Sequence, residues 1–305
     1  MKPTPWNLQK SLPKKWWTNP RVRSNAKKAG LRARFFYLTS VVLSNLNHNP
    51  KPEYEQPNPN NPHFNYMIIN LISGPRNIST ALMYSFAQRE DTKVVDEPFY
   101  ASYLDRFPEI EHPGKQEILQ SMAREISLVL SEIEELSKKH EVVFLKNMAH
   151  HHLGISWDYL LPLNNVFLIR NPKQLIASFA QVIEQPTLQD IGLKEEVDLF
   201  QYVAENGHNP AIVLDSATIL ENPEKGLKLL CQKLEIPFTE KMLSWQKGAI
   251  AEDGVWASYW YKNVHGSSGF AKQKTSERSL PTHCEALYQE ALPHYQTLIK
   301  QAINL

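Results

Sequence analysis

The chain has 305 residues, of which 42% are hydrophobic and 21% charged, a composition typical of one α/β domain of ordinary size with a short extension. Charge is unevenly distributed: residues 1–52 contain 11 Lys and Arg and no acidic residue, whereas 61–305 contain 22 basic and 30 acidic residues, a net charge of −8. The acidic main part argues against general nucleic-acid binding, which needs a basic surface.

Residues 1–62 differ in composition from the rest and contain nine of the 21 prolines. Proline fixes φ and lacks a backbone donor, so the stretch 50–62 (PKPEYEQPNPNNP) opposes helix and sheet. We therefore expect 1–62 to be a disordered basic and proline-rich tail and linker, with at most a short helix over 21–46, and 63–305 to form an α/β domain. A targeting peptide, an anchor to an anionic surface, a mis-extended gene start before Met67 and a tail without function are the alternative interpretations.

The longest apolar stretch of the tail, 35–46, is too short and too interrupted to span a bilayer, so we expect no stable membrane insertion. Cys231 and Cys284 lie in helical patterns beside apolar residues, and we expect buried thiols rather than a disulfide. We expect a cytoplasmic protein, with an N-terminal targeting segment as the alternative. The sequence does not indicate an oligomeric state.

From Met67 onward, short apolar runs alternate with helical patterns, two of which begin with a proline in the first turn. Strands that alternate with helices form a parallel sheet with crossover helices, so we expect an α/β fold. The expected elements in chain order are strand 67–72, helix 79–89, strand 93–98, helix 116–140, strand 141–146, strand 165–170, helix 172–184, strand 211–216, helix 223–236 and helix 283–303.

The turn after the first strand predicts an anion site. Backbone N–H groups at a helix start carry partial positive charge, and hydroxyl and guanidinium side chains add donors. The alternative is that Ser79 only caps the helix and Arg76 lies on the surface. The pattern GxxxxGK[ST] of ATP-binding loops is absent, which weakens a kinase interpretation. The residues of this turn are Ser73, Gly74, Pro75, Arg76, Asn77, Ile78, Ser79 and Thr80.

Two later segments also have the residue types of a phosphate site. Arg170 ends a strand and Ser178 lies two turns into the next helix, so the pair can grip one phosphate from two sides. Gly266, Gly269 and Lys272 form a GxxGxxK pattern, in which glycines admit close backbone approach and the lysine adds charge. The alternatives are an incidental arginine at a helix start and an ordinary flexible loop.

In this order, the three segments resemble those of the P-loop sulfotransferase superfamily. Residues 74–82 (GPRNISTAL) look like its 5′-phosphosulfate loop, although Asn77 and Ile78 stand where the family often has serine and glycine. Arg170 with Ser178 is similar to its 3′-phosphate motif, and 266–272 to its nucleotide-covering loop.

The resemblance implies a three-layer P-loop-like fold with a central parallel sheet flanked by helices. It further implies transfer of a sulfonate group from 3′-phosphoadenosine-5′-phosphosulfate (PAPS) to an acceptor hydroxyl or amine, with 3′,5′-ADP as product and no metal. Arg76 and the loop amides would then stabilise the charge that develops on the leaving oxygen.

Glu97 follows the second strand and is our candidate for the general base. The carboxyl ends of parallel strands gather at one edge of the sheet, which also carries the loop of Arg76. Some branches of the sulfotransferase superfamily show a similar arrangement, with a catalytic Glu about twenty residues past the Arg or Lys of the loop. The alternative is that Glu97 caps the next helix or pairs with Arg76. We expect its neighbour Asp96 to point to the opposite face and to be structural.

His150 is the second candidate for a base or an acceptor contact, together with His151. Other branches of the superfamily use a histidine base in a Lys-x-His pattern, but in this sequence Met148 occupies the histidine position after Lys146. Adjacent histidines rarely converge on one ion, so the run 150–152 does not predict a metal site. The aromatic segment 256–261 would stack on adenine, line the acceptor pocket or pack in the core.

Two other functions compete with sulfonate transfer. A P-loop nucleotide kinase or hydrolase predicts ATP binding and magnesium dependence. A catalytically inactive module predicts binding of a 3′-phosphonucleotide without transfer. We expect a small-molecule acceptor, whose identity the sequence does not reveal, and no nucleic-acid partner.

Overall fold

The computed structural model describes residues 66–303 except Val182 and 271–278. The expected tail and linker over 1–62 and the short helix over 21–46 lie outside the described residues. Both cysteines are buried and free, as expected. No helix in the described part of the chain is long and apolar enough to cross a bilayer.

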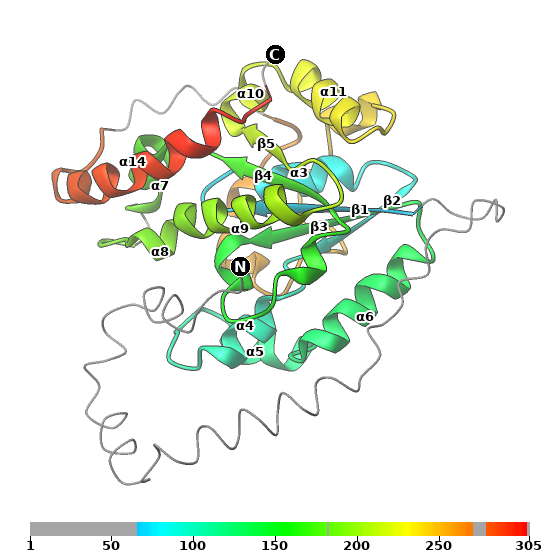
Figure 1. Cartoon of the computed structure of the whole chain (residues 1–305), viewed down its shortest axis with the longest axis horizontal. Helices are drawn as coiled ribbons and strands as arrows, with labels where there is room; N and C mark the ends of the chain where they lie inside the picture. The colour runs from blue at the N-terminus through cyan, green and yellow to red at the C-terminus, as the bar shows by residue number, and fades with distance from the viewer. Residues whose placement is uncertain (1–65, 182, 271–278, 304–305) are drawn as a thin grey trace, which may run out of the picture. The chain divides into compact units, whose positions relative to one another are not determined.

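Within the described residues, five parallel strands form one sheet in the order β2-β3-β1-β4-β5 (Figure 1). The central strand β1 is buried on both faces by neighbouring layers, which explains its continuous apolar run. Its Leu71 lies between Lys146 on one side and Val166 on the other. The strands are β1 (Met67–Ser73), β2 (Thr92–Asp96), β3 (Val142–Met148), β4 (Asn164–Ile169) and β5 (Ile212–Asp215).

Helices cover both faces of this sheet and make three layers. Leu71 packs in a core cluster with α3 and α11, whereas its neighbour Ile72 packs in a cluster with α9 and α14 on the other face (Figure 1). Because successive side chains of the strand point to opposite faces of the sheet, they pack into two separate hydrophobic clusters. The helices are α3 (Ser79–Phe86), α4 (Tyr100–Arg106), α5 (Lys115–Ser121), α6 (Ile126–Ser137), α7 (Pro172–Phe179), α8 (Leu188–Ile191), α9 (Leu193–Asn206), α10 (Ser216–Glu221), α11 (Pro223–Lys233), α12 (Ala257–Trp260), α13 (Lys262–His265) and α14 (Glu285–Ile299), with short 3-10 turns η3 (Ala149–His152), η4 (Asp158–Leu160), η5 (Glu240–Leu243) and η6 (Thr282–Cys284).

The order of the strands determines where a ligand can bind. The chain builds one half of the sheet with β2 and β3 beside β1, and then crosses to the other side for β4 and β5. In open α/β sheets, ligands bind outside the carboxyl ends of strands at such a change of direction. The expected α/β fold with a central parallel sheet is confirmed.

One expected element is wrong. The helix expected over 116–140 is two helices, α5 and α6, because Met122 and Glu125 adopt extended backbone conformations between them. The apolar spacing continues across this break, so the sequence pattern does not reveal it. The other expected helices and strands are present, with ends that differ by at most five residues.

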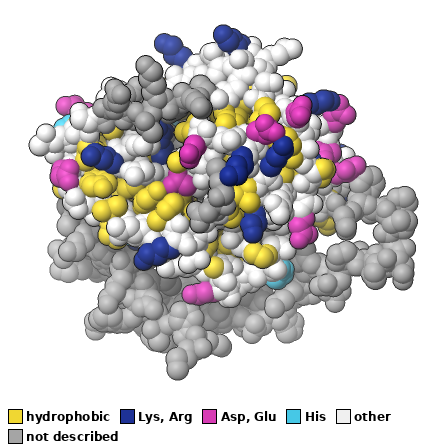
Figure 2. Space-filling model, turned by 90° about the horizontal axis from the view of Figure 1, so that it is seen from above, with side chains coloured by type: hydrophobic (Ala, Val, Ile, Leu, Met, Phe, Trp, Pro, Cys, Tyr) yellow, Lys and Arg dark blue, Asp and Glu magenta, His cyan; other side chains and the backbone are white. Residues whose placement is uncertain are grey.

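The face of the molecule in Figure 2 carries basic and acidic side chains interspersed with hydrophobic ones. No surface of a single charge dominates the described part of this view.

Candidate active site

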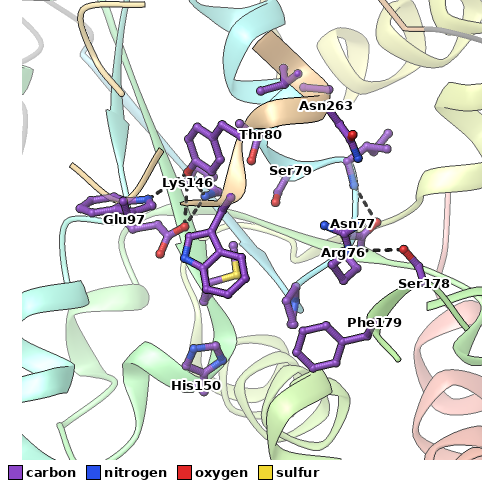
Figure 3. Close-up of a pocket in the computed structure, with 18 of the residues that line it drawn as sticks. Arg76, Asn77, Ser79, Thr80, Glu97, Lys146, His150, Ser178, Phe179 and Asn263 are labelled. Carbon is purple, nitrogen blue, oxygen red and sulfur yellow. Dashed lines mark hydrogen bonds and ion pairs between the residues drawn. The ribbon is translucent and has the colours of Figure 1, made fainter. Parts of the chain in front are cut away.

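A pocket of about 1170 Å³ opens at the carboxyl ends of the central strands. Among the segments that line it, three are far apart in sequence: the turn after β1, the end of β3 with η3, and Arg170 with the end of α7. Figure 3 shows Arg76, Glu97, Lys146 and Ser178 around this space. The pocket therefore lies where the strand order predicts a ligand.

The turn after β1 is held tightly against its surroundings. A Cβ atom at Gly74 would lie 2.2 Å from the carbonyl oxygen of Ile191, so only glycine fits there. The N–H of Gly74 donates to Oε1 of Glu196 on α9 at 2.8 Å. Burial raises the pKa of Glu196 well above its ordinary value, so its carboxyl favours the neutral form and adds little negative charge beneath the turn.

The start of α3 is open to an anion. Its N-cap position is occupied by Ile78, which makes no side-chain cap, so the alternative that Ser79 caps this helix is wrong. The first N–H groups of a helix lack intrahelical partners and attract anions. Ser79 and Thr80 line the pocket beside them, and the side-chain amide of Asn77 ties the turn to the carbonyl of Leu168.

Arg76 joins the turn to the second predicted segment. Its backbone carbonyl accepts a hydrogen bond from Nη1 of Arg170 at 2.7 Å, and its Nε donates to Oγ of Ser178 at 3.3 Å. Both partners are buried and line the pocket. Arg76 itself has φ 58, a left-handed conformation that is costly for a residue other than glycine and is often found at functional turns.

The third predicted segment reaches the pocket only in part. Gly269 lines it and forms an isolated bridge with Ser244. Gly266 caps the end of α13 and does not line the pocket, whereas Ser267 beside it does. Lys272 lies outside the described residues.

Glu97 lies across the pocket from Arg76 (Figure 3). It follows β2 with φ 47, and this left-handed turn breaks the alternation of side chains along the strand. Asp96 and Glu97 therefore both reach Nζ of Lys146 on β3, Asp96 at 3.1 Å. The expectation that Asp96 points to the opposite face is wrong, and Glu97 pairs with Lys146 rather than with Arg76.

Burial raises the pKa of Glu97 to about 7, helped by the charge of Asp96 and opposed by Lys146 and Tyr261. Burial alone would lower the pKa of Lys146, but Asp96 and Glu97 outweigh it and the net shift is upward. Lys146 thus keeps its charge, while Glu97 exchanges protons near neutral pH. A carboxyl poised in this way suits a general base.

Aromatic rings and histidines line the pocket beyond Glu97. The ring of His151 stacks on Tyr100 with centroids 4.5 Å apart, and the ring planes of His150 and His151 are at 90° to each other. Burial lowers the pKa of His150 to about 3 and that of His151 well below its ordinary value, so both rings are neutral. His150 is therefore a weak base, and its place in the pocket suits contact with an acceptor better.

Three adjacent histidines do not form a metal site. Nδ1 of His152 is engaged with the hydroxyl of Tyr159. Across 66–303, leaving out the undescribed positions, no group of three or more His, Cys, Asp or Glu side chains is arranged to hold a metal ion.

The sequence did not indicate a role for Glu196 or Lys146, or a polar role for Tyr261. Lys146 ends the expected strand 141–146, a position that predicts an approach to the carboxyl edge of the sheet, and Tyr261 belongs to the aromatic segment 256–261. Tyr261 lines the pocket, as one of the interpretations of this segment expects, but its aromatic character does not predict the bond of its hydroxyl to Lys146. Glu196 sits in an ordinary amphipathic helix, and nothing in its pattern indicates contact with the turn after β1.

Residues 67–302 match the family model described as "Sulfotransferase domain". Two curated proteins of Arabidopsis thaliana are similar to this chain: branched-chain-amino-acid aminotransferase-like protein 1 is 38% identical over 232 residues, and protein 2 is 36% identical over 232. Each match covers 76% of this chain and 41% of the relative, so the chain spans about two fifths of their length.

Among solved structures, the sulfotransferase domain of the Synechococcus PCC 7002 olefin synthase has a TM-score of 0.50 and 16% identity to this chain. The likeness covers 81% of this chain and 98% of that domain. At this level of identity, it is a likeness of fold.

Proposed function

The chain belongs to the sulfotransferase domain family, and from this premise we propose that it moves a sulfonate group from PAPS to a hydroxyl or amine of a small acceptor. One observation carries the proposal. Arg76, Arg170 and the uncapped start of α3 meet at one end of a pocket whose other end holds Glu97.

The cationic end of the pocket suits a nucleotide with phosphate groups at two positions. The turn at 73–80 supplies helix N–H groups, hydroxyls and Arg76 for the phosphosulfate. Arg170 and Ser178 lie beside it and would hold the 3′-phosphate. A 3′-phosphate is what distinguishes PAPS from ADP-type nucleotides, so this second contact is the basis of donor selection.

Glu97 is placed to remove the acceptor proton. As the acceptor oxygen or nitrogen forms its bond to sulfur, the bond from sulfur to the bridging phosphate oxygen breaks and 3′,5′-ADP leaves. The proton passes to Glu97, and Arg76 with the loop N–H groups stabilises the charge on the leaving oxygen. Each such donor contributes on the order of 3–4 kcal/mol to transition-state stabilisation.

The residues that line the acceptor end of the pocket favour an acceptor without negative charge. Its described lining combines neutral histidines with the rings of Tyr100 and Trp256. Glu111 and Asp190 are also present there, and they would repel an anionic acceptor. A small-molecule acceptor, the lack of a nucleic-acid partner and a cytoplasmic location remain predictions.

The competing functions find less support. Schiff-base chemistry of the aminotransferase kind needs a lysine with a lowered pKa, and Lys146, which is the lysine among the described lining residues, has a raised one. A kinase of the P-loop type would use the lysine of GxxxxGK[ST], which the turn lacks. The aminotransferase-like name belongs to relatives that extend well beyond this match.

The test is incubation of the purified chain with sulfur-radiolabelled PAPS and a panel of neutral aromatic alcohols and amines. We expect label to appear on at least one acceptor, with 3′,5′-ADP formed in equal amount. Binding of 3′,5′-ADP with no transfer to any acceptor would instead favour the inactive nucleotide-binding module. If neither binding nor transfer occurs, the proposal is wrong.

A further inference from the structure

The ammonium group of Lys146 has three protons, and the structure gives it three acceptors. They are Oε1 of Glu97, Oδ1 of Asp96 at 3.1 Å and the hydroxyl of Tyr261 at 2.6 Å. The side chain of Lys146 is 1% exposed, so water does not compete for these bonds. No proton of Lys146 is left to reach a sulfonate oxygen.

We propose that Lys146, Asp96 and Tyr261 form a buried clamp that holds one oxygen of Glu97 and leaves the other as the proton acceptor of the transfer. The three clamp residues are positioning residues that act through Glu97. This inference rests on the proposed function, because it assigns the reactive atom of the base.

The hydroxyl of Tyr261 is as fully engaged as Lys146. It accepts hydrogen bonds from Nζ of Lys146 and from Nε1 of Trp256 at 3.1 Å, and it donates its own proton to Asp96 at 2.8 Å. Asp96 also accepts from the N–H of Gly254 through Oδ2 at 3.2 Å. Burial raises the pKa of Tyr261 well above its ordinary value, with Asp96 adding to it, so the phenol stays neutral and keeps this pattern.

The free end of the base is Oε2 of Glu97. It lies 3.8 Å from Nε2 of His151, which is too long for a hydrogen bond. An acceptor hydroxyl placed between them can donate to Oε2 and face the imidazole at the same time. Nε2 of His151 is buried and has no hydrogen-bond partner among the described residues, so a polar group from a ligand would satisfy it.

The groups that face Glu97 act on its proton affinity in opposite directions. Lys146 from β3 favours the ionised form, and Asp96 from β2 disfavours it. The hydroxyl of Tyr261, between α12 and α13, gives its proton to Asp96 and lies 3.5 Å from Oε1 of Glu97, so it favours the ionised form less than Lys146 does. His151 from η3 and Tyr100 from α4 face the carboxyl as neutral groups, since burial shifts both away from their charged forms. The clamp therefore predicts that its two charged members have opposite effects when removed.

The test measures ionisation of Glu97 directly, by carbon NMR of protein with labelled glutamate side chains. Glu97→Gln identifies the signal by removing it. Lys146→Met should move the titration midpoint up by about one pH unit or more, and Asp96→Asn should move it down by a similar amount. The acid limb of the kcat/KM profile should move in the same two directions.

Two matched variants complete the experiment. Lys93→Met removes a partly exposed lysine on the neighbouring strand, paired with Glu252, and should leave the midpoint unchanged. Tyr261→Phe keeps the ring and removes the hydroxyl, which should raise the midpoint slightly and serves if Lys146→Met fails to fold.

The outcomes separate the clamp from the proposed function. Opposite shifts in the NMR titration without sulfonate transfer would support the clamp and contradict the transferase. If the titration midpoint of Glu97 is unchanged in Lys146→Met and Asp96→Asn, or moves in the same direction in both, the clamp is wrong even if transfer occurs.

Discussion

Nε of Arg76 donates to Oγ of Ser178 at 3.3 Å across 102 positions of sequence. This bond joins the turn after β1 to the helix after β4, the two segments that carry the pocket's phosphate-binding residue types. A single ligand can therefore touch both. The proposed binding of PAPS depends on this contact between the two segments.

Arg76→Ala should lower turnover about 10²–10³-fold, because the charge on the leaving oxygen loses a forked cationic donor. Binding of 3′,5′-ADP should weaken but persist, since Arg170 and the helix N–H groups remain. Turnover is measured with labelled PAPS and binding by calorimetry. Arg124→Ala, which removes an exposed arginine paired with Asp105, is the control and should change neither. Unchanged turnover in Arg76→Ala would contradict the role.

Glu97→Gln should lower turnover about 10²–10⁴-fold while 3′,5′-ADP still protects the protein in a thermal shift. The amide keeps the size of the side chain and a carbonyl for Lys146, but it cannot take a proton. Glu109→Gln alters an exposed carboxylate nearby and should behave as the unmodified chain does. Near-normal turnover in Glu97→Gln would show that another group is the base.

Activity should fall on the acid side of pH 7. Burial raises the pKa of Glu97 to about 7, so below this value the carboxyl is mostly protonated and cannot accept a proton. The expected kcat/KM declines about tenfold for each pH unit once Glu97 is protonated. The profile should be recorded over pH 5–9 with a saturating donor. A flat profile through this range would contradict ionisation of Glu97 as the step that enables transfer.

Gly74→Ala should destabilise the protein, because the new Cβ would lie 2.2 Å from the carbonyl oxygen of Ile191. Overpacking of this kind costs about 1–3 kcal/mol or more, and roughly 2–4 °C in Tm for each kcal/mol is expected in a domain of this size. Gly266→Ala is a matched comparison: its Cβ would meet the carbonyl of Lys262 at 3.4 Å, an ordinary contact. Equal Tm values for the two variants would contradict the tight packing at Gly74.

The sequence is sufficient to predict the alternation of strands and helices and the pocket's position at the strand ends. These features follow from local patterns: buried runs such as 67–73, a proline at the start of α7 and a turn with the hydroxyls of Ser79 and Thr80. The approach of Arg170 and Ser178 to Arg76 also follows, because parallel strands place their carboxyl ends on one edge.

Other features depend on contacts that no local pattern contains. The left-handed turn at Glu97 puts Asp96 on the same side, and alternation along a strand predicts the reverse. The break between α5 and α6 lies inside a continuous apolar pattern. Glu196 reaches Gly74 only because α9 packs under the turn after β1. Each of these results from tertiary packing and not from propensity.

The most direct measurement is a calorimetric comparison of 3′,5′-ADP with 5′-ADP in metal-free buffer. We predict that 3′,5′-ADP binds at least about tenfold more tightly, a difference of ~1.4 kcal/mol, and that Arg170→Ala removes the preference. Equal affinity for the two nucleotides, or tighter binding of ATP with magnesium, would contradict a site built for a 3′-phosphate and with it the assignment of PAPS as donor.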